Sequence, residues 1–212
     1  MLGKYLYIYV VDRDFGFAPN PFCGFCSLAT CKPHIRNRAK IGDWIMGVGG
    51  CRLNATGKCI YLMKVTDKLK FDEYWANTKY QFKKPYRNGS RLRMVGDNIY
   101  HKENNCWVQE DSHHSNPDGS PNQENLKRDT NISDKVLISS HFYYFGSKAV
   151  TVPLNEIGYK NVRSHRKILI NENIQAFMDK IENKYKKNTI ISDPFQFNDA
   201  HKRVNQTNGR IV

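Results

Sequence analysis

The chain is short of acidic residues and has no long apolar run. It contains 33 Lys and Arg residues against 20 Asp and Glu residues, which gives a net charge of +13. No apolar run approaches the roughly 20 residues of a membrane-spanning helix. The start, "MLGKYLYIYVVDRD", lacks the small-residue cleavage site of a secretory signal. We therefore expect a cytoplasmic protein without a membrane partner.

The positive charge favours a polyanionic partner, DNA or a nucleotide, over a basic one. The alternative is a soluble protein that happens to be basic. Common cofactor and catalytic motifs are missing as well. The "GVGG" of residues 47–50 lacks the Lys-Ser/Thr of a phosphate-binding loop, and no Rossmann, zincin or Gly-x-Ser-x-Gly pattern occurs. We predict no cofactor.

Cysteines are few, but half of the six lie in one stretch, Cys23-x2-Cys26-x4-Cys31, followed by His34. Without export they stay reduced. Four such ligands can bind zinc, yet the spacing fits no common closed pattern and no second cysteine pair follows. We predict no metal here. Cys31 stands beside Lys32, whose charge would lower the pKa of the thiol and make it nucleophilic. A buried, inert Cys31 is the alternative.

The apolar pattern predicts an α+β protein of short, mostly antiparallel strands and a few helices. Expected strands cover residues 4–11, 44–48 and 58–69, the last two as a hairpin, with two short strands around "KENN" and a strand pair in 135–146. Expected helices start near Pro33 and at Asp72 as N-cap, and an amphipathic one covers 170–188. Residues 112–134 read as a long polar loop. We expect a domain of residues 1–150 and a C-terminal helical extension of residues 151–212, packed on it or trailing from it.

Two resemblances add to this reading. The succession of "KIGDWIMGVGG", "KCIYLMKVTDKL" and "FDEYWAN" within residues 4–80 is similar to PUA-like barrels of the ASCH, EVE and YTH groups. That resemblance implies a mixed barrel or curled sheet with flanking helices. It also implies a base, often a modified one, held in an aromatic pocket at the barrel mouth.

The second resemblance rests on more phrases, spread over residues 5–146. These are "RDFGFAPNPF", "LATCKPHIR", "GDWIMG", "GDNIYH", "QEDSHHS", "DGSPN", "NLKRDT" and "VLIS". Together they resemble the nucleotide modification associated domain, the second of its numbered families. This resemblance implies a place beside phage and bacterial systems that hypermodify bases in DNA, with possible protein partners from such a pathway. It implies no defined activity.

The end of the first strand and the loop after it supply residue types that bind a base. Aromatic rings can stack on it, and carboxylate or amide groups can read its edge. The alternative is a rigid Pro-rich loop whose aromatics complete the core, with the tryptophans also in the core. The predicted ligand-binding residues are Asp12, Arg13, Phe17, Asn20, Phe22, Cys31, Lys32, Trp44, Asp97, Asn98 and Tyr100.

Acids and histidines gather between residues 97 and 118, and such sets do acid–base chemistry or hold a divalent ion. His113 and His114 are adjacent, so in an extended strand only one of them faces a given site. We predict His101, Asp111 and His113 as catalytic residues. Solvated turn residues are the alternative.

Two basic stretches, 32–40 and 79–93, are candidates for contact with phosphates. The second has six cations, no acid and interleaved aromatics, a pattern that can follow a nucleic-acid backbone and stack bases. An ordinary solvated face is the alternative. The predicted backbone contacts are Arg36, Arg38, Lys83, Lys84, Arg87, Arg91 and Arg93.

The sequence thus favours a protein that binds a modified nucleotide or base in a DNA base-hypermodification or related nucleic-acid pathway. A second interpretation is an enzyme of that pathway in which His113 or His101 acts as acid–base and Asp111 or Asp97 orients it. A third is a basic subunit that binds an acidic protein.

Overall fold

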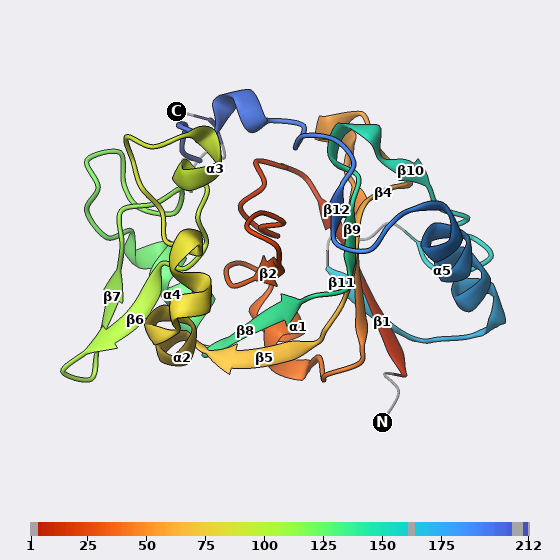
Figure 1. The fold of residues 1–212 in the computed structure, drawn as a ribbon, viewed down its shortest axis with the longest axis horizontal. Helices are drawn as coiled ribbons and strands as arrows, with labels where there is room; N and C mark the ends of the chain where they lie inside the picture. The colour runs from red at the N-terminus through yellow and green to blue at the C-terminus, as the bar shows by residue number, and fades with distance from the viewer. Residues whose placement is uncertain (1–3, 161–163, 205–209, 212) are drawn as a thin grey trace.

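The computed structural model describes residues 4–160, 164–204 and 210–211. Its main sheet runs in the order β11-β1-β3-β4-β9-β12, and β10 pairs with β4 (Figure 1). The neighbours β1 and β3 are parallel, as are β9 and β12, and the other pairs are antiparallel. The strands are β1 (Tyr5–Val11), β3 (Trp44–Gly49), β4 (Lys58–Lys64), β9 (Phe142–Tyr144), β10 (Val150–Thr151), β11 (His165–Leu169) and β12 (Thr189–Ile190).

Two smaller sheets flank the main one. The first has the order β2-β8-β5 and the second is the hairpin β6-β7. Their strands are β2 (Cys26–Leu28), β5 (Asp67–Lys70), β6 (Tyr100–Glu103), β7 (Cys106–Gln109) and β8 (Lys135–Ser139). Within the described residues the edge strands β11 and β12 do not pair, so the main sheet is not a closed barrel. The expected α+β class is confirmed, whereas a closed barrel is not observed.

The helices are short apart from the last. They are α1 (Pro33–Arg38), α2 (Phe71–Ala76), α3 (Arg91–Met94), α4 (Gln123–Thr130) and α5 (Glu172–Lys184), with 3₁₀ turns at Cys51–Leu53, Thr78–Lys83, Gly146–Lys148 and Phe197–Asp199. None of the helices in the described part of the chain has the length and apolar character that crossing a bilayer requires.

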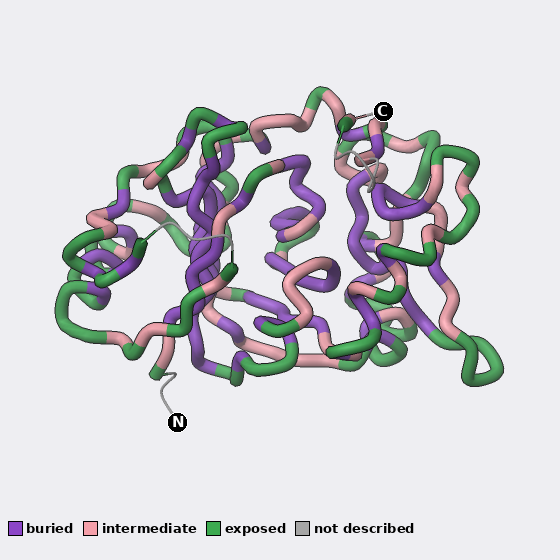
Figure 2. The backbone as a smooth tube through the Cα atoms, turned by 180° about the vertical axis from the view of Figure 1, so that it is seen from behind, coloured by how far each residue is buried: buried purple, intermediate pink, exposed green. Residues whose placement is uncertain are grey.

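The apolar run of the first strand arises because both faces of the main sheet are covered. Tyr7 and Tyr9 of β1 lie in one core cluster, and Leu6 and Ile8 lie in another on the opposite face. Alternate side chains of a strand point to opposite faces, so a strand buried on both sides reads as continuously apolar. The central strands β1, β3, β4 and β9 are accordingly mostly buried in Figure 2, whereas β10, β11 and β12 are intermediate or exposed.

The segment after residue 150 takes part in the main sheet. The strand β11 pairs with β1, and β12 pairs with β9. The helix α5 buries Ile174, Phe177, Met178 and Ile181 in the second core cluster. Within the described part of the predicted extension, residues 151–212, the strands β11 and β12 and the helix α5 thus pack on the rest of the chain.

Several expected elements are confirmed with shifted bounds. These are the strands at 4–11 and 44–48, the hairpin β3-β4, the helix that begins at Pro33, the strands around "KENN" and the helix α5. The expected strand 58–69 is wrong as a single unit, because the chain turns at Val65 and Thr66 and enters the β2-β8-β5 sheet as β5. The helix α2 has Lys70, not Asp72, as its N-cap.

Two further expectations need correction. The strands β8 and β9 do not pair with each other, because β8 joins β2 and β5 while β9 joins β4. The expected loop 112–134 contains the helix α4, which is capped by Asn122: its side chain accepts a hydrogen bond from the Asn125 N–H at 2.9 Å. This helix is polar and two turns long, so it carries almost no apolar period.

Candidate functional site: a cysteine–histidine–aspartate relay

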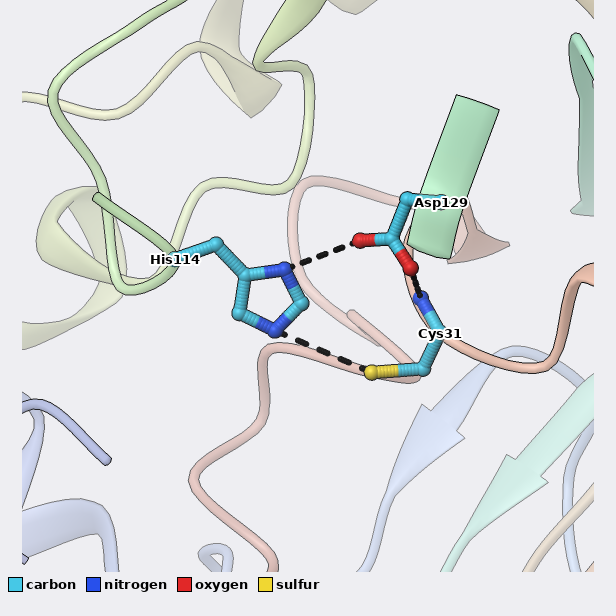
Figure 3. A group of neighbouring side chains, drawn as sticks. All are labelled: Cys31, His114 and Asp129. Carbon is cyan, nitrogen blue, oxygen red and sulfur yellow. Dashed lines mark hydrogen bonds and ion pairs between the residues drawn. The ribbon is translucent and has the colours of Figure 1, made fainter. Parts of the chain in front are cut away.

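Three side chains from distant parts of the sequence meet beside the loop that follows β1. Cys31 lies between β2 and α1, His114 lies in the turn after β7, and Asp129 lies near the end of α4. The Cys31 Sγ is 3.7 Å from His114 Nε2, and His114 Nδ1 is 3.0 Å from Asp129 Oδ2 (Figure 3). The imidazole therefore lies between the thiol and the carboxylate.

The backbone around Cys31 is held in an unusual conformation. Cys31 and Lys32 have φ angles of 55° and 41°, a left-handed region that costs energy for residues other than glycine. The Cys31 N–H donates to Asp129 Oδ1 at 2.9 Å, and its carbonyl accepts from Arg36 Nε at 2.8 Å. The conformation is thus fixed by partners outside the loop.

Arg36 is fully buried and joins three segments through their carbonyl groups. Besides Cys31, it donates to the carbonyls of Asp129 at 2.5 Å and Lys135 at 2.7 Å. Its predicted contact with a nucleic-acid backbone is wrong, because a side chain with no exposed surface cannot reach a phosphate. Its role is to hold the Cys31 loop against α4 and β8.

Asp129 is enclosed by donors. Its carboxylate accepts from Tyr100 Oη at 3.0 Å and from Arg128 Nε at 3.0 Å, in addition to His114 and the Cys31 N–H. Burial alone would raise the pKa of this carboxyl, but His114 and Arg128 outweigh burial and hold it well below its usual value. Asp129 is therefore ionised at neutral pH and fixes the orientation of the imidazole.

The thiol and the imidazole perturb each other. Burial would raise the pKa of Cys31, but the charges of Arg128 and His114 lower it to about 7. Burial would lower the pKa of His114, but Cys31 and Asp129 raise it. Both shifts favour the thiolate and imidazolium form of the pair, which is the reactive state of a cysteine nucleophile.

The same three residues offer ligand atoms within 4.8 Å of one another, so a metal ion is the competing interpretation. A zinc ion needs its ligand atoms around one centre, about 2.0–2.3 Å away. Here His114 faces Asp129 with one ring nitrogen and Cys31 with the other, so no single nitrogen faces both partners (Figure 3). The order Cys31, His114, Asp129 is instead that of a nucleophile, a base and a carboxylate that orients the base. Cys23, Cys26 and His34 do not share this cluster.

A pocket of about 230 Å³ opens beside the thiol. Its wall combines the end of β1, the loop after it, the Cys31 loop, the His113–His114 turn and Arg128. It contains three cations, one exposed carboxylate and two phenylalanines. The lining residues are Tyr9, Val10, Val11, Asp12, Arg13, Phe15, Phe17, Ala18, Cys31, Lys32, His113, His114, Arg128 and Val204.

The two adjacent histidines have different environments. His113 packs against Phe15 and Phe17, with ring centroids 4.4 Å and 5.2 Å apart, and burial holds its pKa well below the usual value. It is therefore neutral at pH 7 and lies against the phenylalanines of the wall. His114, not the predicted His113, is the histidine that faces the thiol.

The structure brings together six of the predicted site residues. Asp12, Arg13, Phe17, Cys31, Lys32 and His113 all line this pocket. Tyr100 does not line the pocket, but its hydroxyl donates a hydrogen bond to Asp129.

Four predicted residues belong instead to an interior polar network. The Lys83 ammonium donates to the carbonyls of Asn20 and Phe25 at 2.8 Å and 2.7 Å, so its predicted contact with phosphate is wrong. Asp97 accepts from Ser27 Oγ at 2.7 Å. Buried polar groups need such partners, and the bonds leave Asn20, Lys83, Asp97 and Asn98 away from the pocket.

The remaining predicted site residues lie elsewhere. His101 pairs with Glu110 at 2.8 Å and stacks on Trp75. Asp111 forms ion pairs with Arg87 and Arg203. Phe22 stacks on Phe197 and Trp44 packs against His141. None of these four lines the pocket with the thiol, because each is occupied by a neighbour from another element. Arg38, Lys84, Arg87, Arg91 and Arg93 are partly or fully exposed.

Sequence reasoning missed Arg128 and Asp129 because they sit in a segment read as loop. They lie 15 positions or fewer from His114, whereas Cys31 is 83 positions from it. No local pattern joins residues at such separations. The only signal was the acid beside a base in "NLKRDT".

No curated protein and no solved structure matches this chain. A family model for nucleotide modification associated domain 2 matches residues 3–201. The match includes Cys31, His114, Asp129, the loop after β1 and α5, and it extends beyond residues 5–146. The chain therefore belongs to the nucleotide modification associated domain 2 family.

Proposed function

We propose that this protein is a thiol-dependent enzyme that transfers or removes an acyl group on a nucleotide or base. Cys31 is the nucleophile, His114 the acid–base, and Asp129 positions His114. The observation that carries the proposal is the relay in which His114 joins the Cys31 thiol to a buried carboxylate at the wall of a pocket. Family membership supports the nucleotide substrate.

The reaction follows from the order of the groups. The Cys31 thiolate attacks the carbonyl carbon of an ester or amide and forms a thioester. The bond to the leaving oxygen or nitrogen breaks, and His114 gives that atom a proton. Water or an amine then loses a proton to His114 and attacks the thioester, which releases the acid or the new amide and restores the thiolate.

The pocket offers contacts that suit a nucleotide. Phe15 and Phe17 supply aromatic surface against which a base can pack. The wall is positively charged on balance, because Arg13, Lys32 and Arg128 face the single acid Asp12. Such a wall favours a ligand that carries phosphate or carboxylate.

A second candidate function is binding of a modified base without chemistry. It is favoured by one observation: Asp12, Arg13, Phe17 and Lys32, which suit base recognition by residue type, line one pocket. The two functions differ in what they require of Cys31. A protein that only binds the base keeps its affinity for that base in Cys31→Ser, whereas a thiol-dependent enzyme loses all turnover in this variant.

Acylation by p-nitrophenyl acetate, followed by intact-protein mass spectrometry, tests the proposal. We expect one acetyl group on Cys31, loss of that label in Cys31→Ser, and acylation at least about 100-fold slower in His114→Ala. Cys106→Ser removes an exposed cysteine away from the pocket and serves as the matched control. Equal labelling in His114→Ala and the wild type would show that the relay does not activate the thiol. Slower acylation in the presence of deoxynucleoside monophosphates would link the pocket to a nucleotide.

A further inference from the structure

The 3₁₀ turn Thr78–Lys83 and the loop that joins it to α3 each expose one aromatic side chain. Phe82 is 70% exposed and Tyr86 is 63% exposed. They have the highest exposure of all large hydrophobic side chains in the described residues, and they are the only aromatic ones in that exposed set. Neighbouring exposed aromatics indicate a surface made for contact with a partner.

Backbone bonds to Arg93 hold both residues in place. The Arg93 guanidinium donates to the Phe82 carbonyl at 2.7 Å and lies 5.7 Å from the centre of the Phe82 ring. The Tyr86 N–H donates to the Arg93 carbonyl at 2.9 Å. The two rings are therefore presented on a structured loop.

The charges around these rings are positive and only partly balanced. Residues 79–93 contain no acid. Arg87 forms an ion pair with Asp111, whereas Arg91 bonds to the neutral Asn198 at 2.7 Å and Lys84 lies over Trp75. We call the set of Lys79, Phe82, Lys84, Tyr86, Arg87, Arg91 and Arg93 the aromatic–basic surface.

We propose that the aromatic–basic surface binds a single-stranded nucleic acid, with bases stacked on Phe82 and Tyr86 and phosphates near the cations. Exposed rings suit unpaired bases, because every base has a face that can stack and a duplex hides those faces. The surface lies outside the Cys31 pocket and goes beyond the proposed acyl chemistry. If a nucleic-acid strand binds here, the nucleotide on which the enzyme acts is part of a polymer.

The surface adjoins the turn that holds the relay histidine. Arg87 pairs with Asp111 and donates to the Pro117 carbonyl at 2.7 Å. Asp111 also accepts from Ser115 Oγ at 2.8 Å. Residues 111–115 thus connect the surface to His113 and His114, and α3 lies at the same end of the molecule as this turn (Figure 1). A strand bound at Arg87 would therefore lie against the turn that carries His113 and His114.

Fluorescence anisotropy with labelled oligothymidylate of about 20 nucleotides tests the proposal, with oligouridylate and the corresponding duplex as further arms. We expect the single strand to bind more tightly than the duplex, and Phe82→Ala and Tyr86→Ala each to weaken binding about tenfold or more. Leu169→Ala and Ile41→Ala remove side chains of similar exposure, 59% and 60%, from other surfaces and should leave binding unchanged. Lys79→Gln should lower the slope of log affinity against log salt by about 1.

Several outcomes would overturn this proposal. One is that Phe82→Ala and Tyr86→Ala bind the single strand as tightly as the wild type does. Another is tighter binding of the duplex than of the single strand. A third is binding only to phosphatidylserine vesicles or to an acidic protein. The acyl chemistry is tested separately. Cys31→Ser should bind oligothymidylate like the wild type, and Phe82→Ala should be acylated at Cys31 at the wild-type rate. The DNA and RNA arms show which polymer the surface prefers.

Discussion

Arg128 contacts two of the three relay residues, His114 and Asp129. It donates to Asp129 Oδ1 at 3.0 Å and Oδ2 at 3.2 Å, and its Nη2 lies 3.3 Å and 3.4 Å from the two ring nitrogens of His114. Its positive charge favours the Cys31 thiolate. The sequence predicts this role for Lys32, whose ammonium lies over the Tyr9 ring, 4.5 Å from its centre, and also interacts electrostatically with Cys31.

Arg128→Met should therefore raise the pKa of the Cys31 thiol from about 7. A lowered thiol pKa means that thiolate is abundant above pH 7, so the variant needs a higher pH for the same reactivity. We expect the midpoint of the pH–rate profile for iodoacetamide alkylation of Cys31 to rise by about one unit. Lys127→Met removes a neighbouring exposed cation and should leave the midpoint in place. An unchanged midpoint in Arg128→Met would assign the low pKa to His114 alone.

At the scale of elements, α4 and the turn after β7 position the relay together. The His114 carbonyl accepts from Asn125 Nδ2 at 2.8 Å and from Gln109 Nε2 at 3.2 Å. The Asn122 N–H in turn donates to Gln109 Oε1 at 2.6 Å. The N-terminus of α4 is thus tied to β7, and the end of the same helix carries Asp129.

Asn122→Ala should lower the free energy of unfolding by about 1 kcal/mol, because the Asn125 N–H loses its capping partner. Urea denaturation measures this change. Gln123→Ala, at an exposed position of the same helix, should change stability by less than about 0.5 kcal/mol. Equal effects of the two substitutions would show that the cap contributes nothing.

At the scale of the whole molecule, Asp14 connects the loop after β1 with the C-terminal part of the chain. Its carboxylate accepts from Tyr144 Oη and from the Phe195 N–H at 3.2 Å, and its backbone exchanges two hydrogen bonds with Gln196. Burial raises the pKa of Asp14 to about 6, although these hydrogen bonds oppose the rise. Ionised Asp14 therefore costs the folded state energy.

This raised pKa predicts a pH dependence of stability. The folded state binds the Asp14 proton more tightly than the unfolded state does, so the contribution of Asp14 to stability falls as pH rises from about 4 to about 6. The unfolding free energy of Asp14→Asn relative to the wild type should rise by up to about 3 kcal/mol across this window and then level off. Urea denaturation at a series of pH values measures it. Asp179→Asn, on an exposed part of α5, is the control. A constant difference would refute the buried titration.

Local sequence patterns were enough to predict most strands and the residues that form one wall of the pocket. The strand before Asp12, Arg13 and Phe17 is predicted by its run of apolar residues. The helix after Cys31 and Lys32 is predicted by Pro33 at its first position. These patterns involve residues only a few positions apart, so local backbone geometry is enough to determine the strand or helix that they predict. The interior network of Asn20, Lys83 and Asp97 was misread, because the type of a polar residue does not tell whether its partner is a ligand or a backbone carbonyl.

The sequence by itself determined the α+β class, the positive charge and the family, because composition, periodicity and ordered phrases are properties of the linear chain. Only the tertiary structure decided that His114 faces Cys31 while His113 packs on phenylalanine, and that Asp129 completes the relay. The physical reason is that the pKa of Cys31 depends on burial and on the charges of Arg128 in α4 and His114 in the turn after β7. These elements approach Cys31 only when the sheets pack.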